Sequence, residues 1–385
     1  MALTRAARCW SIRFIAFLTP KNNPQATMTK PRARDLGLPF PGTPGPLNAI
    51  TDVPGVLVGS TTLTDPAQNM RTGVTAIRPR SDAGIPVPVW AGHYALNGNG
   101  EMTGTHWIDD AGYMIGPVCI TNTHGIGAVH HGASRWMTQH YADYFGTDHA
   151  WAMPVVAETY DGILNDINAF HVTADHAIAA LQSARSGPVA EGSVGGGNGM
   201  ISYQFKAGNG TASRLFSIGG QGYTMGCLVQ ANHGRRPDFQ VLGKPVGKLM
   251  PEGTFDRGLP QKEMGSIIVV LITDAPLSGL SLKQVAKRAA LGIGRGGTPG
   301  GNSSGDIFLA LSTANPGPMP QHAPATLTKT EINGEQIDPL YLAAVEAVEE
   351  AVVNAIVAGE DVATFKPQGQ IVPGIDTLKL AALFR

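Results

Sequence analysis

Glycines divide this sequence into short apolar segments, and their placement constrains the fold more than any other feature. The chain has 49 glycines in 385 residues, well above the roughly 7% of an average protein. They cluster between apolar runs without a fixed period, which excludes a collagen-like repeat. Because glycine permits tight turns and close backbone approach, this pattern predicts an α/β protein built in layers.

Charge and cysteine content exclude several classes of partner. The net charge is -1 and the pI is near 6.8, so nucleic acid and anionic membrane surfaces are not expected as partners. Cys9, Cys119 and Cys227 show no CxxC spacing, which argues against a disulfide framework and indicates the cytoplasm. No stretch after the N-terminal region reaches the roughly 18 apolar residues of a membrane span.

The first 27 residues differ in character from the rest. Arg5, Arg8 and Arg13 surround a short apolar piece at 14–18, and a signal peptide would need a longer apolar run and a small-residue cleavage site. Residues 1–27 are therefore expected to be a disordered or mis-started extension, with Met28 as an alternative start.

Apolar runs separated by glycine-bearing turns predict a series of short strands. The run at 266–272 is continuously apolar, which is typical of a strand buried on both faces. The ordered part is expected to begin at residues 53–58. The predicted strands are residues 74–77, 87–90, 118–121, 155–156, 215–218, 225–230, 266–272 and 307–312.

Helical spacing of apolar residues predicts helices over 171–181, 281–291 and 339–358. Ser281 is expected to cap the second of these. Since no internal repeat and no domain linker are found, residues 28–385 are expected to form a single domain.

The glycine-rich segment 292–305 carries the candidate chemistry. Residues 301–305 match G-x-S-x-G with Ser303 central, but that motif needs a strand, a sharp turn and then a helix. Gly292, Gly294 and Gly297 match G-x-G-x-x-G, which must follow a strand and open a helix. The predicted order here is helix, loop, strand, so neither motif has its context, and a purely structural turn also remains open.

A self-cleaving serine explains more of this segment. A serine at the head of a strand, after a flexible loop, can attack the carbonyl before it and convert the peptide bond into an ester that water opens. Its freed α-amino group, with a pKa of about 7.7–8.0, can then serve as the base for its own hydroxyl.

With these residues, the chain resembles the L-aminopeptidase/D-esterase family, which includes the β-peptidyl aminopeptidases. The resemblance runs from Leu47 to the C-terminus. It rests on motifs in family order at residues 48–55, 96–104, 158–162, 164–166, 208–214, 228–232, 273–277, 304–306 and 312–315.

The resemblance implies an αββα sandwich of the N-terminal-nucleophile type, self-cleaved into an α chain (to 303) and a β chain (304–385). It implies assembly of these pairs into a tetramer or larger homo-oligomer, with no metal and no cofactor. The implied activity is release of N-terminal residues from small peptides, amides or esters of L-, D- or β-amino acids.

Carried over by motif, Ser304 resembles the nucleophile, which places the cut between Ser303 and Ser304, with Ser303 as the competing nucleophile. Asn232 resembles an oxyanion donor, and Tyr160 a phenol that lines the oxyanion site. Glu158 resembles the carboxylate that meets the substrate's free amine. Each of the last three is also common as a structural residue.

The last predicted helix offers an orienting carboxylate. With 100° per residue, Glu349 falls within the apolar stripe of that helix, Glu346 at its border, and Glu350 well away from it. The family has an acidic residue near this position that orients the nucleophile, so Glu349 is favoured and Glu346 is the reserve. Family members can carry a second serine beside that carboxylate, but Ala347 and Val348 stand nearby here and no serine does.

Three rival functions follow from the same residues. The histidines at 124, 130, 131, 140 and 149 invite a metallohydrolase, but no ligand motif is present, and adjacent His130 and His131 would point to opposite sides of a strand. An acyltransferase of the ornithine acetyltransferase kind would be built around threonine rather than serine. A non-catalytic binding protein on the same scaffold would leave the chain uncut.

Overall fold

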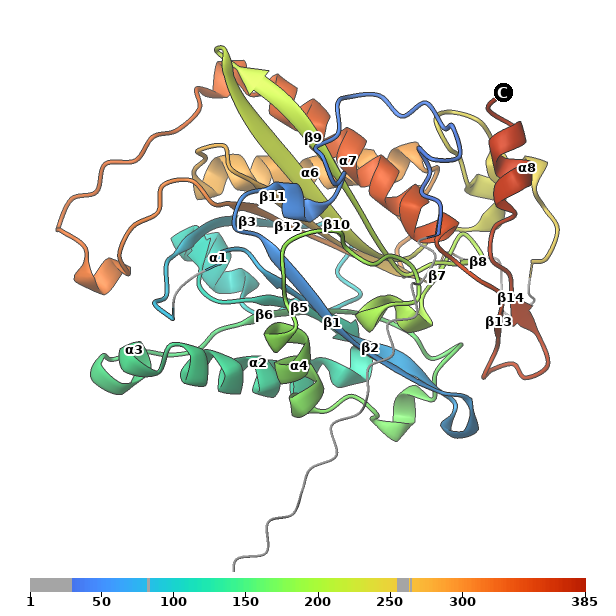
Figure 1. Ribbon diagram of the computed structural model, residues 1–385, viewed down its shortest axis with the longest axis horizontal. Coiled ribbons are helices and arrows are strands. Elements are labelled where there is room, and N and C mark those ends of the chain that lie inside the picture. The colour runs from blue at the N-terminus through green and yellow to red at the C-terminus, as the bar shows by residue number, and fades with distance from the viewer. Residues whose placement is uncertain (1–29, 82–83, 255–262, 264) are drawn as a thin grey trace, which may run out of the picture. The chain divides into compact units, whose positions relative to one another are not determined.

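Two β-sheets lie face to face in this computed structural model, which describes residues 30–81, 84–254, 263 and 265–385 (Figure 1). Residues 31–385 form one compact unit. The expectation of a disordered extension at residues 1–27 lies outside the described residues.

The larger sheet has six strands in the order β4-β3-β12-β11-β10-β9. β11 and β12 run parallel, because helix α6 (Gly279–Arg295) connects them as a crossover, and the other neighbours are antiparallel. The strands are β3 (Val89–Ala95), β4 (Tyr113–Met114), β9 (Asn209–Ile218), β10 (Gln221–Asn232), β11 (Ser266–Thr273) and β12 (Gly305–Ser312).

The smaller sheet has four strands in the order β1-β2-β5-β6. Its parallel pair, β5 and β6, is connected through α2 (Ile126–His140). The strands are β1 (Leu57–Asp65), β2 (Met70–Arg78), β5 (Val118–Asn122) and β6 (Val155–Thr159).

Helices cover the outer face of each sheet and complete four layers (Figure 1). α6 and α7 (Asp338–Val357) pack on the six-stranded sheet, and α2 and α4 (Ala174–Gln182) pack beside the four-stranded sheet. The predicted αββα sandwich is confirmed. Smaller elements are α1 (Thr105–Ala111), α3 (Ala142–Thr147), α5 (Val246–Leu249), α8 (Thr377–Ala382), β7 (Ile201–Ser202), β8 (Phe205–Lys206), β13 (Val362–Ala363) and β14 (Ile371–Val372).

The central strands are apolar throughout because both of their faces are buried. Leu228 of β10, Ile268 of β11 and Leu309 of β12 point into the core between the sheets. Their neighbours Val229 and Val269 point outward into the core under α6 and α7. Alternate residues thus serve two different cores, which requires an unbroken apolar run rather than an alternating one.

Several element boundaries differ from the sequence predictions. Ser278, not Ser281, caps α6: its hydroxyl accepts a hydrogen bond from the backbone of Ser281 at 3.3 Å. The predicted strand at 215–218 is the end of β9, which begins at Asn209.

Helix α2 was not predicted. Val129, Ala133, Trp136 and Met137 form its buried face at helical spacing, but glycines and histidines obscured the pattern. His130 and His131 therefore lie on a helix, and the argument that placed them on a strand was wrong. In the part of the chain that the structure describes, no helix is long and apolar enough to cross a bilayer.

Helix α7 is buried around its whole circumference, because every residue from Ala343 to Val357 is buried. The one-sided stripe expected from the sequence was therefore wrong for Glu350, which is 0% exposed. Arg214 of β9, itself 1% exposed, satisfies it with a nitrogen-to-oxygen distance of 2.7 Å and also contacts Glu346 at 3.3 Å. Arg34 binds the other oxygen of Glu350 at 2.9 Å.

Replacement of Arg214 should test how strongly α7 depends on this buried pair. Arg214→Ala removes the arginine that contacts Glu346 and one of the two arginines that contact Glu350. We therefore expect a loss of roughly 3–5 kcal/mol in the free energy of unfolding, measured by urea denaturation. Arg135→Ala is the matched control, because its pair with Asp175 is exposed and should be worth about 1 kcal/mol or less. Equal effects of the two substitutions would contradict the prediction.

Candidate active site

Ser304 immediately precedes Gly305, the first residue of β12 in the six-stranded sheet. The loop that follows α6 turns back on itself, and the backbone nitrogen of Ser304 donates to the carbonyl of Gly301 at 2.8 Å. The segment thus runs helix, loop, strand, which is the wrong order for either the G-x-S-x-G or the G-x-G-x-x-G motif. The Ser304 side chain is fully buried, and its hydroxyl donates to Oδ1 of Asp306 at 2.6 Å.

A loop formed by residues 96–101, here called the asparagine loop, encloses this serine. Its Leu96 nitrogen donates to the backbone carbonyl of Asp306 at 2.9 Å. Asn97 Nδ2 donates to the second oxygen of Asp306 at 3.0 Å. Asn99 Nδ2 donates to the carbonyl oxygen of Ser303 at 2.7 Å. The sequence resemblance included this loop but assigned no role to its asparagines.

Glycines allow the asparagine loop to approach the head of β12. A Cβ on Gly305 would collide with the backbone carbonyl of Asn99. A Cβ on Gly100 would lie 3.2 Å from Oε1 of Glu158 and 3.4 Å from the Cα of Gly305. Glu158 of β6 is therefore close to the start of β12, although the two strands belong to different sheets.

The Glu158 carboxylate is buried and held by two donors. It accepts a hydrogen bond from the backbone nitrogen of Glu101 at 3.0 Å and another from the Thr123 hydroxyl. Burial raises the pKa of Glu158 above its ordinary value, and these two hydrogen bonds oppose that rise. A carboxylate removed from water in this way gains most from a cationic partner.

Asn232 ends β10, two strands from β12. It is paired with Ser266, which is paired with Gly305, so its backbone lies roughly 10 Å from that of Gly305 at two strand spacings. Its Oδ1 accepts from Ile201 and its Nδ2 donates to the carbonyl of Tyr160, both at 2.9 Å. The Tyr160 side chain is 42% exposed. One hydrogen bond therefore links the Asn232 side chain to the backbone of Tyr160. The oxyanion roles of Asn232 and Tyr160 stay predictions.

Glu263 anchors the loop before Ser304 and was not found from the sequence. Its carboxylate accepts from the backbone nitrogen of Gly301 at 3.1 Å and from that of Gly234 at 2.9 Å. The Thr298 hydroxyl lies 2.7 Å from the same carboxylate. A single buried side chain thus ties the loop before Ser304 to the turn after Asn232.

Asp306 is the carboxylate that contacts the Ser304 hydroxyl. Burial raises the pKa of Asp306 above its ordinary value. Burial also lowers the pKa of the neighbouring His233 to about 4, so this imidazole is neutral near pH 7 and supplies no positive charge there. The sequence analysis used Asp306 only as part of a motif, because nothing in the spacing showed that its side chain would turn back toward Ser304.

The predicted orienting carboxylates have other partners in this structure. Glu349 pairs with Arg295 Nη1 at 3.1 Å, and Glu346 pairs with Arg214. Among the described residues no hydrogen bond or ion pair joins either carboxylate to Ser304. The orienting role of Glu349 stays a prediction.

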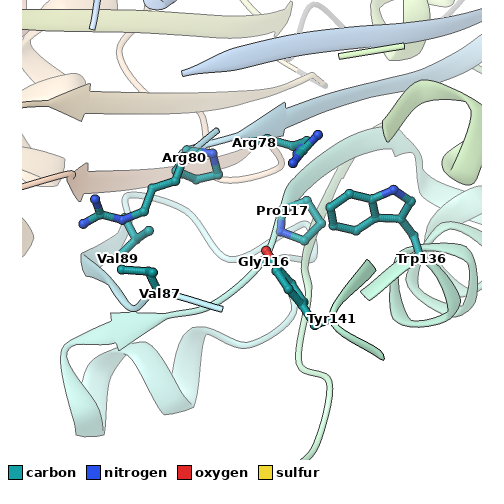
Figure 2. A pocket seen from close by; sticks show the side chains of 9 residues that line it. Arg78, Arg80, Val87, Val89, Gly116, Pro117, Trp136 and Tyr141 are labelled. Carbon is teal, nitrogen blue, oxygen red and sulfur yellow. The ribbon is translucent and has the colours of Figure 1, made fainter. Parts of the chain in front are cut away.

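Other chemically suggestive features lie away from Ser304 or do not assemble. A pocket lined by Arg78, Arg80, Trp136 and Tyr141, among others, opens between β2, β3 and α2 (Figure 2). The pocket includes Val89, the first residue of β3. The other end of β3, at Ala95, pairs with Ile307, close to Ser304, so the pocket and the serine lie at opposite ends of this strand. Across the residues that the structure describes, no three His, Cys, Asp or Glu side chains gather as a metal site.

An αββα sandwich with a buried serine at the head of a central strand defines a hydrolase of the N-terminal-nucleophile class. The model of peptidase family S58 matches residues 48–369. A β-peptidyl aminopeptidase, BapA, of Sphingosinicella microcystinivorans is 47% identical over 353 residues, covering 87% of each chain. That of Sphingosinicella xenopeptidilytica is 42% identical over 379 residues, covering 93% of each chain.

Solved structures agree with this assignment. The L-aminopeptidase D-Ala-esterase/amidase of Ochrobactrum anthropi, described as a variant of the Ntn hydrolase fold, superposes with a TM-score of 0.88 at 55% identity, covering 92% of this chain and 98% of that one. A β-aminopeptidase of a Burkholderia species gives 0.80 at 45% identity, covering 91% and 98%. The chain belongs to peptidase family S58 and is a serine aminopeptidase. The acyltransferase and binding-protein alternatives are thereby set aside.

Proposed function

We propose that this aminopeptidase cleaves its own chain between Ser303 and Ser304, and that the freed Ser304 is the nucleophile of the mature enzyme. The observation that carries this proposal is the 2.6 Å hydrogen bond from the Ser304 hydroxyl to Asp306. In the uncut chain the Ser304 nitrogen is an amide and cannot act as a base, so Asp306 is the group placed to accept the proton. Ser303, whose side chain is exposed, has no comparable partner among the described residues.

The processing reaction needs only the residues present and one water molecule. The Ser304 oxygen attacks the Ser303 carbonyl carbon, forming a C–O bond while its proton passes to Asp306. The C–N bond then breaks, and the proton moves from Asp306 to the leaving nitrogen, which becomes the new α-amine. Water hydrolyses the resulting ester, leaving a carboxylate on Ser303 and restoring the Ser304 hydroxyl.

Turnover would reuse the same serine with a different base. The freed α-amine has a pKa of about 7.7–8.0 and is bonded to the same residue as the hydroxyl that it activates. Asn232 has a second amide hydrogen beyond the one donated to Tyr160, and this hydrogen is available to the oxyanion of the acyl-enzyme step. The exposed Tyr160 phenol would line the same oxyanion site.

Glu158 would select substrates with a free N-terminal amine. Its buried carboxylate lies beside Gly100 and the head of β12, where a substrate's ammonium group would compensate it. Small peptides, amides and esters of L-, D- or β-amino acids are the proposed substrates. The names of the Ochrobactrum and Sphingosinicella proteins, which include both L-aminopeptidase and β-peptidyl aminopeptidase, support this range.

We propose further that the processed pairs assemble into a cytoplasmic homo-oligomer, a tetramer or larger. The outer helices of the six-stranded sheet expose Leu280, Leu291 and Leu342 at 71%, 59% and 51%, which supports contacts between copies. Cys119 and Cys227 are buried free thiols, in keeping with a reducing compartment.

Intact-mass spectrometry beside the Ser304→Ala variant tests processing. We expect a C-terminal fragment of residues 304–385 from the native sequence and a single uncut chain from the variant, because the variant lacks the attacking oxygen. A fragment that begins at Ser303 would transfer the role to that residue. An uncut native chain with full aminopeptidase activity would refute the mechanism.

The Asp306→Asn variant tests the base. We expect processing to slow by roughly 10²–10⁴-fold, since the hydroxyl loses its proton acceptor. The native rate should fall as the pH drops through the Asp306 pKa, and because burial raises that pKa the fall should begin above the range of an exposed aspartate. The variant should lack this acid limb; native-like rates in the variant at all pH values would contradict the assignment.

The Glu158→Gln variant tests recognition of the substrate amine. Loss of the charge should raise KM for a free-amine dipeptide roughly 10–100-fold, the value of one hydrogen bond to a charged group, while processing proceeds. Glu101→Gln is the matched control, because Glu101 is exposed and contributes only its backbone nitrogen to Glu158. An unchanged KM in Glu158→Gln would place amine recognition elsewhere.

A further inference from the structure

We propose that Asn99 is the oxyanion donor of the processing step, distinct from Asn232, which would serve turnover. This inference rests on the proposed cleavage between Ser303 and Ser304. It assigns to the asparagine loop a catalytic group that acts on the uncut chain.

The contact is made with the atom that becomes charged. As the Ser304 oxygen attacks, negative charge develops on the carbonyl oxygen of Ser303, and Asn99 Nδ2 is already 2.7 Å from that oxygen. This is at the short end of the usual range for an N–H···O hydrogen bond. Only the amide nitrogen of Asn99 can face a carbonyl oxygen, since two acceptors would repel.

Asn232 does not make this contact in the uncut chain. Its Nδ2 donates to Tyr160 and its Oδ1 accepts from Ile201. Asn232 lies two strands away from Gly305, because Ser266 of β11 stands between them in the sheet. Among the described residues, Asn99 is the side chain that donates to the Ser303 carbonyl.

The donor and the proton acceptor are held by one set of contacts. Asp306 receives the Ser304 hydroxyl on one oxygen and Asn97 Nδ2 on the other, and its backbone carbonyl receives the nitrogen of Leu96. The backbone of Asn99 rests on Gly305, where any side chain would collide with it. Donors that are positioned before charge develops need no rearrangement during the reaction, which is where oxyanion stabilisation is strongest.

The opposite side of the scissile peptide is also fixed. The Ser304 N–H donates to the Gly301 carbonyl at 2.8 Å, while Asn99 binds the Ser303 oxygen. Both polar atoms of the peptide between Ser303 and Ser304 are therefore hydrogen-bonded, which holds the carbonyl carbon in place for attack by the adjacent hydroxyl.

Pulse-labelled synthesis of the full chain, followed by a chase, measures the processing rate directly. We expect Asn99→Ala and Asn99→Asp each to slow the appearance of the 304–385 fragment by about 10²–10³-fold, the usual cost of one oxyanion donor. Asn302→Ala is the matched control. Asn302 lies in the glycine-rich segment just before Ser303, is exposed, and makes no side-chain hydrogen bond within the described part of the chain.

The aspartate variant keeps the shape of the side chain while removing the donor, so it decides the question if the alanine variant misfolds. A far-UV circular dichroism spectrum and a melting curve check that each variant is folded. Folded Asn99→Asp that processes as fast as Asn302→Ala would overturn the proposal.

Material that matures slowly separates processing from turnover. In matured Asn99→Ala we expect kcat to fall at least tenfold less than the processing rate fell, because Asn232 would stabilise the turnover oxyanion. Equal losses would overturn the division between the two asparagines. A native chain that stays uncut, or a Ser304→Ala variant that is still cut, would instead refute the proposed function itself.

Discussion

The parallel pairing of β11 with β12 positions everything else in the candidate site. It sets Gly305 opposite Ser266, and the antiparallel pairing of β10 then sets Asn232 opposite Ser266 from the other side. A shift of one residue in the β11–β12 pairing would turn Asp306 to the opposite face of the sheet. The crossover through α6 and the apolar cores on both faces of these strands hold that register.

The site also requires the asparagine loop to pack closely against the start of β12, and glycines at the contact make this possible. Gly305 admits the asparagine loop, and Gly100 lies between that loop and Glu158. The loop therefore connects the peptide between Ser303 and Ser304, at the head of the six-stranded sheet, with the Glu158 carboxylate of the four-stranded sheet. The proposed processing and the proposed substrate selection would both depend on these six consecutive residues.

The scaffold tolerates buried charge where each charge has a partner. Arg214 forms ion pairs with both Glu346 and Glu350, and Arg34 forms a second ion pair with Glu350. At the site, by contrast, Glu158 and Asp306 are buried with hydrogen-bond donors, and no ion pair joins either of them to a cation among the residues that the structure describes. This difference distinguishes carboxylates that stabilise α7 from carboxylates that are available for chemistry.

Local patterns predicted what depends on local order. The buried strands β11 and β12, the long helix α7 and the helix–loop–strand order around Ser304 were all predicted from residues close together in the chain, and each motif of the family resemblance is itself a short local segment. The N-cap of α6, by contrast, was predicted at Ser281 and lies three residues earlier, at Ser278.

What depends on contacts between distant segments was out of reach of the sequence. Asn99 and Ser303 are separated by 204 residues, and Glu263 joins segments on either side of itself. Helix α7 seemed one-sided because hydropathy cannot show that β9 would bring Arg214 against its polar residues. The sequence by itself determined the layered fold and the candidate nucleophile; only the tertiary structure decided which side chains contact that serine, since register and close packing join residues whose spacing carries no signal.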